Sequence, residues 1–125
     1  MSSETIHTDQ APTNAHYAQA VRAGGLIFVS GQGPFDPETG AVVGLTIQEQ
    51  VHQCLANVQA ILEAAGSSIE KVVSATFLLR DPDDFGGLNE EWDRWFGDAP
   101  PARQGARHPL DMPSLRISIA AIAEA

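Results

Sequence analysis

The sequence has little cysteine, few basic residues and no long hydrophobic run, and each shortage excludes a class of protein. The chain has 125 residues and one cysteine, Cys54, which rules out a disulfide within the chain. No apolar run approaches the ~20 residues that a membrane-spanning helix needs. No basic segment followed by an apolar run opens the chain, so nothing resembles a signal peptide. We therefore expect a single domain over residues 1–125, located in the cytoplasm and without a membrane partner.

Basic residues are outnumbered by acidic residues, 7 to 16, and the formal net charge is −9. Such a surface repels phosphate backbones, whose neutralisation supplies most of the affinity of non-specific nucleic-acid binding. The four histidines are scattered, and no cluster of cysteine, histidine or acidic residues has the spacing of metal ligands. The sequence thus predicts no nucleic-acid partner and no metal site.

The first part of the chain predicts a polar arm followed by a β-hairpin. Residues 1–14 are polar and contain a proline, which is typical of an N-terminal arm. Two apolar stretches, 16–23 and 26–31, flank Gly24 and Gly25. This arrangement predicts two strands that are joined by a tight turn.

A first amphipathic helix follows the hairpin. Thr46 and Glu49 form a capping-box pair at its start, and Gly66 suits the position just after its last turn. Between them apolar side chains recur at helical spacing, at Ile47, Val51, Cys54, Leu55, Val58, Ile61, Leu62 and Ala65. Since Cys54 belongs to this stripe, we interpret it as a small buried hydrophobe rather than as a nucleophile.

A second helix is predicted to begin with Asp81 as its N-cap and Pro82 in its first turn. Its apolar stripe, which we expect to pack in the core, consists of Phe85, Leu88, Trp92, Trp95 and Phe96. Gly86 and Gly87 loosen the start of this helix, because each glycine costs about 1 kcal/mol relative to alanine.

Three further strands complete the predicted order β-β-α-β-α-β-β. They cover the β-branched segment 71–80 and the segments 102–108 and 115–123. Two helices with one apolar face each would cover one face of a mixed sheet, which defines a two-layer α+β domain. The closing strand offers small apolar residues, and such a sheet face favours contact with another subunit over contact with water.

A resemblance to a known family covers the chain from about residue 5 to residue 124, and six segments carry it. They are APTNAHYAQAV, FVSGQGPFDPETG, QCLANVQAILEAAGSSIEKVV, DFGGLNEEWDRWF, PPAR and ISIAAIA. Together they resemble the RidA family, also called YjgF and labelled endoribonuclease L-PSP. The resemblance implies a chorismate-mutase-like fold and a homotrimer with three clefts between neighbouring subunits. It also implies hydrolysis of enamines and imines, such as 2-aminoacrylate and 2-iminopropionate, to 2-keto acids and ammonia without a cofactor.

The family's binding site, carried over position by position, falls on Tyr17, Ser30, Gly31 and Arg103, with Gly105 beside it. The resemblance implies that Arg103 holds the carboxylate of a small imino acid, and a guanidinium suits this role because it donates two parallel hydrogen bonds. The alternative for Arg103 is a salt bridge at a subunit interface. Tyr17 would donate a hydrogen bond or close the pocket wall, or else be a half-buried strand residue. Ser30 and Gly31 would line the pocket with backbone amides, or else simply end a strand.

Three positions depart from the family pattern. Ser118, our candidate catalytic residue, stands where deaminating members carry the glutamate that positions the attacking water, and serine alone is a poor general base. Gly105 replaces a frequent cysteine but keeps a backbone amide. Ala15 and His16 replace a Gly-Pro pair, which makes His16 a substitute acid–base candidate. Because neighbours on a strand face opposite sides, His16 would point away from the cleft if Tyr17 points into it.

Four functional hypotheses follow from the sequence. The first is an enamine or imine deaminase whose activity is reduced or altered by Ser118. The second is a non-catalytic trimer that binds a small carboxylate. The third is the endoribonuclease of the family label, which the negative charge disfavours. The fourth is a diverged enzyme that acts on a larger substrate, for which the small Ser118 side chain makes room.

Overall fold

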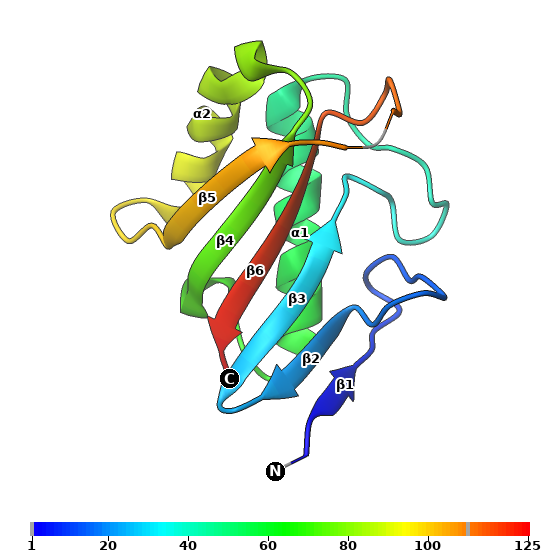
Figure 1. Cartoon of the computed structure of the whole chain (residues 1–125), viewed down its shortest axis with the longest axis vertical. Helices are drawn as coiled ribbons and strands as arrows, with labels where there is room; N and C mark the ends of the chain where they lie inside the picture. The colour runs from blue at the N-terminus through cyan, green and yellow to red at the C-terminus, as the bar shows by residue number, and fades with distance from the viewer. Residues whose placement is uncertain (1, 110) are drawn as a thin grey trace.

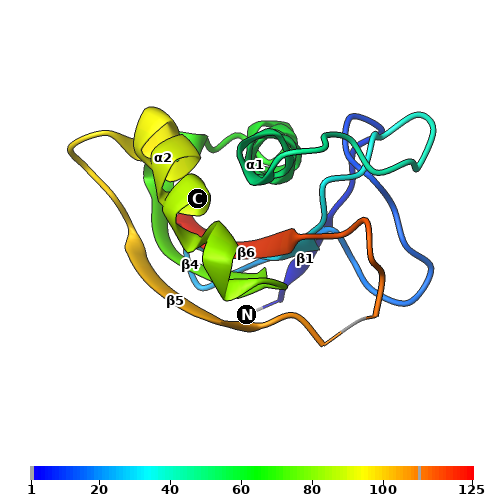
Figure 2. The same cartoon turned by 90° about the horizontal axis from the view of Figure 1, so that it is seen from above.

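A six-stranded sheet and two helices form two layers, with both helices on one face of the sheet, as Figure 1 and Figure 2 show. The structure is a computed structural model that describes residues 2–109 and 111–125. The strands are β1 (Glu4–Ile6), β2 (Ala20–Ala23), β3 (Leu26–Gln32), β4 (Val72–Leu79), β5 (Ala102–Arg107) and β6 (Ile117–Glu124). The helices are α1 (Ile47–Ala64) and α2 (Phe85–Phe96), with short 3-10 turns η1 (Ile69–Lys71) and η2 (Pro82–Asp84). This arrangement confirms the predicted two-layer α+β fold.

The strand order places the last strand of the chain inside the sheet. The order is β1-β2-β3-β6-β4-β5, and among the described strands only the β4–β5 pair is parallel. A parallel pair needs a crossover connection, and α2 supplies it between β4 and β5. As a result β5 forms one edge of the sheet, and α2 lies over the face beside it (Figure 2).

The predicted hairpin is present, but its first strand is shorter than expected. Gly24 and Gly25 adopt φ angles of 60° and 80°, which the tight turn between β2 and β3 requires and which glycine adopts freely. The second strand agrees with the predicted segment 26–31 to within one residue. The prediction that the first strand spans 16–23 is wrong at its start, because β2 begins at Ala20.

Gln19 explains why the strand begins late. Its buried side-chain amide donates to the backbone carbonyls of Thr8 and Pro12, both at 2.9 Å, and its Oε1 accepts a hydrogen bond from the Thr8 amide at 2.8 Å. These bonds hold the preceding segment in a loop that folds back on itself. His16 and Tyr17 therefore lie in a loop and not on a strand.

The first helix forms as predicted. The Thr46 hydroxyl accepts a hydrogen bond from the Glu49 amide and the Glu49 carboxylate accepts one from the Thr46 amide, both at 3.1 Å. Backbone hydrogen bonds, with that from Thr46 the strongest, lower the pKa of Glu49. Cys54 is fully buried with its Sγ 3.7 Å from the Ile117 carbonyl, and burial raises the pKa of its thiol. The interpretation of Cys54 as a buried hydrophobe is confirmed.

The second helix begins in two steps. Asp81 accepts a hydrogen bond from the Asp83 amide at 2.9 Å with Pro82 next to it, as the capping prediction requires, but the first turn is the separate 3-10 turn η2. Trp92 is buried as expected, whereas Phe85 is 44% exposed. Placing Phe85 in the core is therefore wrong, because it lies at the first residue of α2 beside the edge strand. Neither α1 nor α2, the helices of the described part, is long and apolar enough to cross a membrane.

The remaining strands lie close to their predicted positions. β4 and β5 agree with the segments 71–80 and 102–108 to within one residue at each end, and β6 begins two residues later than the segment 115–123. β1 lies within the predicted arm 1–14 and pairs with β2, a strand that the polar sequence there does not indicate.

β6 alternates between the two faces of the sheet. Its residues Ile117, Ile119, Ala121 and Ala123 are buried beneath the helices. The alternate residues Ser118, Ala120 and Ile122 lie on the open face, together with Phe28 of β3, which is 43% exposed. The open face therefore combines small side chains with apolar surface.

Gln50 ties α1 to the segment that precedes β6. This side chain is buried, and its nitrogen donates hydrogen bonds to the carbonyls of Gly44 at 3.1 Å and Ser114 at 2.8 Å. Its Oε1 accepts a hydrogen bond from the Arg116 amide at 2.8 Å. A single amide side chain thus satisfies three backbone groups from two distant segments and fixes the approach to β6.

We expect Gln50→Leu to lower the free energy of unfolding by about 1–3 kcal/mol, because three backbone groups lose their partner in a buried place. Gln59→Leu is the matched control on the same helix, since Gln59 forms no side-chain hydrogen bond within the described residues. Its effect should stay within about 0.5 kcal/mol. Urea unfolding measures both, and equal losses would contradict the bracing role of Gln50.

Candidate carboxylate-binding site

Arg103 lies on the edge strand β5 with its guanidinium over three aromatic rings. Its Cζ is 5.0 Å from the ring centroid of Trp92, 5.1 Å from that of Phe77 and 5.6 Å from that of Phe85. A guanidinium within about 6 Å of a ring centroid is attracted by the negative face of the ring. Phe77 comes from β4 and the other two rings come from α2, so the strand pair and its crossover helix hold the arginine together.

The polar groups of Arg103 remain available. Within residues 2–109 and 111–125 its side chain forms no ion pair and no hydrogen bond. The predicted alternative, a salt bridge at a subunit interface, would need an acidic residue of another subunit. Five N–H donors are left for an incoming acceptor, and aromatic contacts hold the guanidinium without neutralising its charge.

The sequence pattern does not identify the three rings around Arg103 as part of the candidate site. Trp92 and Phe85 belong to a stripe at helical spacing, which is equally typical of a core, and Phe77 lies in a buried strand. The signal that identifies them is the strand register, in which Ala75 pairs with Arg103 and Phe77 pairs with Gly105. Sequence alone does not reveal that register.

Gly105 leaves room for the ring of Phe77. A Cβ atom built on Gly105 would lie 2.1 Å from the Cζ atom of Phe77, so the ring fills the space that a side chain at 105 would need. Gly105 and Phe77 line an apolar cavity of about 480 Å³ together with Phe85 and Arg107. Two of the rings that contact Arg103 therefore also form the wall of this cavity.

Tyr17, Ser30 and Gly31 lie elsewhere, on the β2–β3 side of the molecule. Tyr17 is 53% exposed and lines, with Gly31, a cleft of about 220 Å³. The Ser30 hydroxyl donates to the Ala18 carbonyl at 2.6 Å and its amide donates to the Gln19 carbonyl at 2.9 Å. The polar groups of Ser30 thus shape the loop that carries Tyr17, while Gly31 is exposed with open space where a side chain would be.

Ser118 lies half-buried on the open face of the sheet, opposite Leu78 of β4. Its hydroxyl forms no hydrogen bond within the part of the chain that the structure describes. Its neighbours Ile117 and Ile119 point into the core, as the alternation of side chains along a strand requires.

A single chain does not bring the predicted site residues together. Arg103 and Gly105 lie on the helix-covered face of β5, whereas Ser118 lies on the open face of β6. Tyr17 and Gly31 belong to the other side of the sheet, with β6 and β4 between. Since neighbouring strands are ~4.8 Å apart, three strand spacings separate β3 from β5 by about 14 Å. The predicted site residues therefore lie in three separate places within one chain: the helix-covered face of β5, the open face of β6 and the β2–β3 side of the sheet.

The remaining candidates form no further cluster. His16 is exposed, and its amide donates to the side chain of Asn14 at 2.8 Å. Because His16 lies in a loop, the prediction from strand alternation that it points away from the cleft does not apply. Across the described residues, no three His, Cys, Asp or Glu side chains are placed to hold a metal ion.

Comparison with known proteins places this chain and its fold in a family. The family described as endoribonuclease L-PSP matches residues 8–125. A RutC family protein of Pyrococcus abyssi is 45% identical over 104 residues, which cover 82% of each chain. The crystal structure of RidA from an Antarctic Psychrobacter bacterium has a TM-score of 0.89 at 35% identity, covering 98% of this chain and 99% of that one. Escherichia coli TdcF with bound serine has a TM-score of 0.88 at 32% identity, covering 98% of both chains. The chain belongs to the endoribonuclease L-PSP family, which is the RidA/YjgF family that the sequence resembles.

We predict that Gly105→Ala lowers the stability of the protein by about 1–3 kcal/mol, because the new methyl group overlaps the Phe77 ring. In a Phe77→Leu background the same change should cost less, with a coupling of about 0.5–3 kcal/mol in the double-mutant cycle. Gly31→Ala is the control, since a Cβ there meets no atom within 4 Å. Thermal or urea unfolding measures the cycle, and strictly additive effects would refute the close packing.

Proposed function

We propose that this protein hydrolyses small carboxylate-bearing imines or enamines, such as 2-iminopropionate, to 2-keto acids and ammonia. The clefts in which it does so lie between the subunits of a homotrimer. Water adds to the carbon of the C=N bond, the C–N bond then breaks, and the nitrogen leaves as ammonia. Water and the imine alone balance this reaction, so it needs no cofactor.

The observation that carries the proposal is that the Arg103 guanidinium is positioned by aromatic rings and has no acidic partner in the described chain. A carboxylate bound to it by two parallel hydrogen bonds would be fixed in plane and orientation. The apolar cavity beside Gly105 offers space for the carbon part of the substrate. A carboxylate-bearing ligand is further supported by the serine bound to the related TdcF.

A cleft between subunits would account for the separation of these site residues within one chain. In a threefold assembly Tyr17 and Gly31 of one subunit would face Arg103 of the next. The open face of the sheet supports such an assembly, because Phe28 and the small Ala120 offer apolar surface that another subunit would cover.

Ser118 would reach such a cleft from the open face of the sheet, and it would contribute only weakly to the chemistry. Its free hydroxyl is able to hold a water molecule, but near neutral pH it does not accept the proton of that water as a glutamate would. Imines hydrolyse readily in water, so holding substrate and water in the right orientation gives acceleration by itself. We therefore expect a slow deaminase.

A non-catalytic trimer that binds a small carboxylate is the second candidate, and Ser118 is the observation that favours it. It would keep the Arg103 site and lack the acid that positions water. Cleavage of RNA, which the family label names, is disfavoured by the net charge of −9.

Arg103→Ala is expected to abolish binding of a small 2-keto acid such as 2-oxobutyrate. Arg103→Lys should restore little of it, because an ammonium group lacks the planar two-point geometry. Lys71→Ala is the control, which removes an equal charge at the start of β4. Isothermal calorimetry measures all four proteins, and equal affinity in wild type and Arg103→Ala would rule out the anchor role.

A subunit-mixing experiment tests whether the cleft is shared. Arg103→Ala removes one half of the proposed site, and Gly31→Trp blocks the other half. When equal amounts of these two inactive variants are refolded together, about one cleft in four in a threefold ring receives two intact halves. Recovery of that fraction of the 2-oxobutyrate binding supports a shared cleft, and no recovery speaks against it.

Hydrolysis of 2-iminopropionate should be weak in the wild type and should rise by about 10²–10⁴-fold in Ser118→Glu, the range that one acid–base group contributes. Ser118→Ala is the control and should remain near the wild-type rate. Light scattering measures the oligomeric state of each variant alongside the assay. Dissociation of Ser118→Glu into monomers would mean that Ser118 packs in a dry subunit interface. A fast wild-type enzyme would overturn the need for an acid here and would direct attention to His16.

A further inference from the structure

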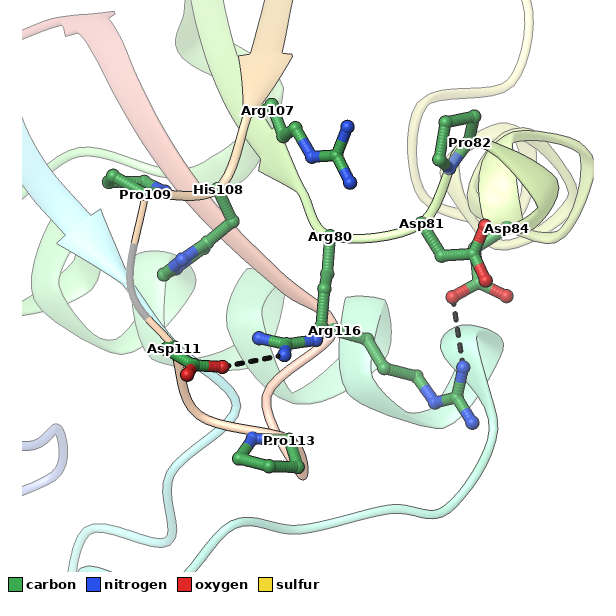
Figure 3. A pocket seen from close by; sticks show the side chains of 10 residues that line it. All are labelled: Arg80, Asp81, Pro82, Asp84, Arg107, His108, Pro109, Asp111, Pro113 and Arg116. Carbon is green, nitrogen blue, oxygen red and sulfur yellow. Dashed lines mark hydrogen bonds and ion pairs between the residues drawn. The ribbon is translucent and has the colours of Figure 1, made fainter.

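A second cavity lies where β4 ends and where the chain passes from β5 to β6 (Figure 3). Its volume is about 580 Å³. The chain has seven basic residues in all, and three of them, Arg80, Arg107 and Arg116, line this cavity. In a protein with a net charge of −9, such a concentration of guanidinium groups marks a place suited to an anion.

The three arginines are held differently. Arg107 projects toward the cavity, and its side chain forms no ion pair or hydrogen bond with any residue that the structure describes (Figure 3). Arg80 pairs with Asp111 at 3.1 Å and Arg116 pairs with Asp84 at 3.0 Å. The Asp111 side chain is 95% exposed, so its pair with Arg80 is weak and easily exchanged for another anion.

The two other acidic residues that line the cavity, Asp84 and Asp81, already interact with other groups of the chain. The Asp84 carboxylate is engaged with Arg116, and the Asp81 carboxylate accepts the hydrogen bond that caps η2. Arg107 is therefore the cation that a ligand reaches without displacing any group of the described chain.

This cavity adjoins the apolar cavity beside Gly105. Arg107 and Pro82 line both of them. Arg103, Gly105 and Arg107 alternate along β5 and so share one face of the strand, with four residues, or about 13 Å of extended chain, from the first arginine to the second. A carboxylate lies about 2.8 Å from the guanidinium nitrogens that bind it, so two anionic groups bound between these arginines lie closer together than that.

The geometry points to a substrate with two anionic groups, namely an imino or enamino acid that carries a second carboxylate at the far end of a short apolar chain. This inference rests on the proposed function. The first carboxylate binds Arg103, the carbon chain lies against Phe77 and Phe85, and the second carboxylate binds Arg107 next to Arg80. Arg107 is a specificity residue, because it selects the far end of the substrate and takes no part in the addition of water or the loss of ammonia.

Matched 2-keto acids, the products of such a reaction, test the inference. 2-Oxoadipate and 2-oxohexanoate have the same chain length and differ only in the second carboxylate, and 2-oxosuberate and 2-oxooctanoate repeat the comparison with a longer chain. Calorimetry with the intact protein should show that the wild type binds at least one dicarboxylate about tenfold more tightly than its partner, the effect of one charge-assisted pair.

Arg107→Gln should remove this preference, so that the two acids of each pair bind with equal affinity. Lys71→Gln, which removes an equal charge far from the cavity, should keep the preference. Equal binding of both acids by the wild type, or a preference that survives in Arg107→Gln, overturns the second subsite alone. Failure of every 2-keto acid to bind, or monocarboxylate binding that survives in Arg103→Ala, instead refutes the proposed function and the inference with it.

Discussion

The parallel pairing of β5 with β4 is the constraint on which the site depends. It requires a crossover, and the crossover is α2, which brings Phe85 and Trp92 over the same face of the sheet as Phe77. The register of the pair then decides which residues of the edge strand meet those rings. Arg103 and Gly105 are on the helix-covered face because of this register, so a shift by one residue would turn both to the opposite face.

Charge is distributed unevenly over an acidic molecule. Four of its seven basic residues, Arg80, Arg103, Arg107 and Arg116, line or adjoin two neighbouring cavities at one edge of the sheet. In a chain with a net charge of −9, this gathering of arginines is the basis on which we propose an anionic substrate at this edge. Under the proposed function, the same distribution would favour a small carboxylate over a long polyanion such as RNA, because RNA would extend beyond the edge onto acidic surface.

Local signals predicted the fold well, and contacts between distant segments limited the prediction of the site. The capping box of Thr46 with Glu49 acts over four residues, so the sequence sufficed to find it. The start of β2 was missed because Gln19 bonds to backbone eleven residues earlier. Arg103 was identified through the family resemblance, but the rings beneath it were not, since only the pairing of strands places Phe77 beside Gly105.

The position of β6 has a consequence for how the protein is made. β6, the last of these strands in the sequence, lies between β3 and β4 in the sheet. Until residues 117–124 are in place, the strands β1 to β3 and the pair β4 and β5 therefore share no strand pairing with each other. On the ribosome those residues are the last of this domain to leave the exit tunnel. The two parts of the sheet are therefore joined only after synthesis of this domain is nearly complete. We expect this long-range pairing of β6 with β3 and β4 to be a late and slow step of folding.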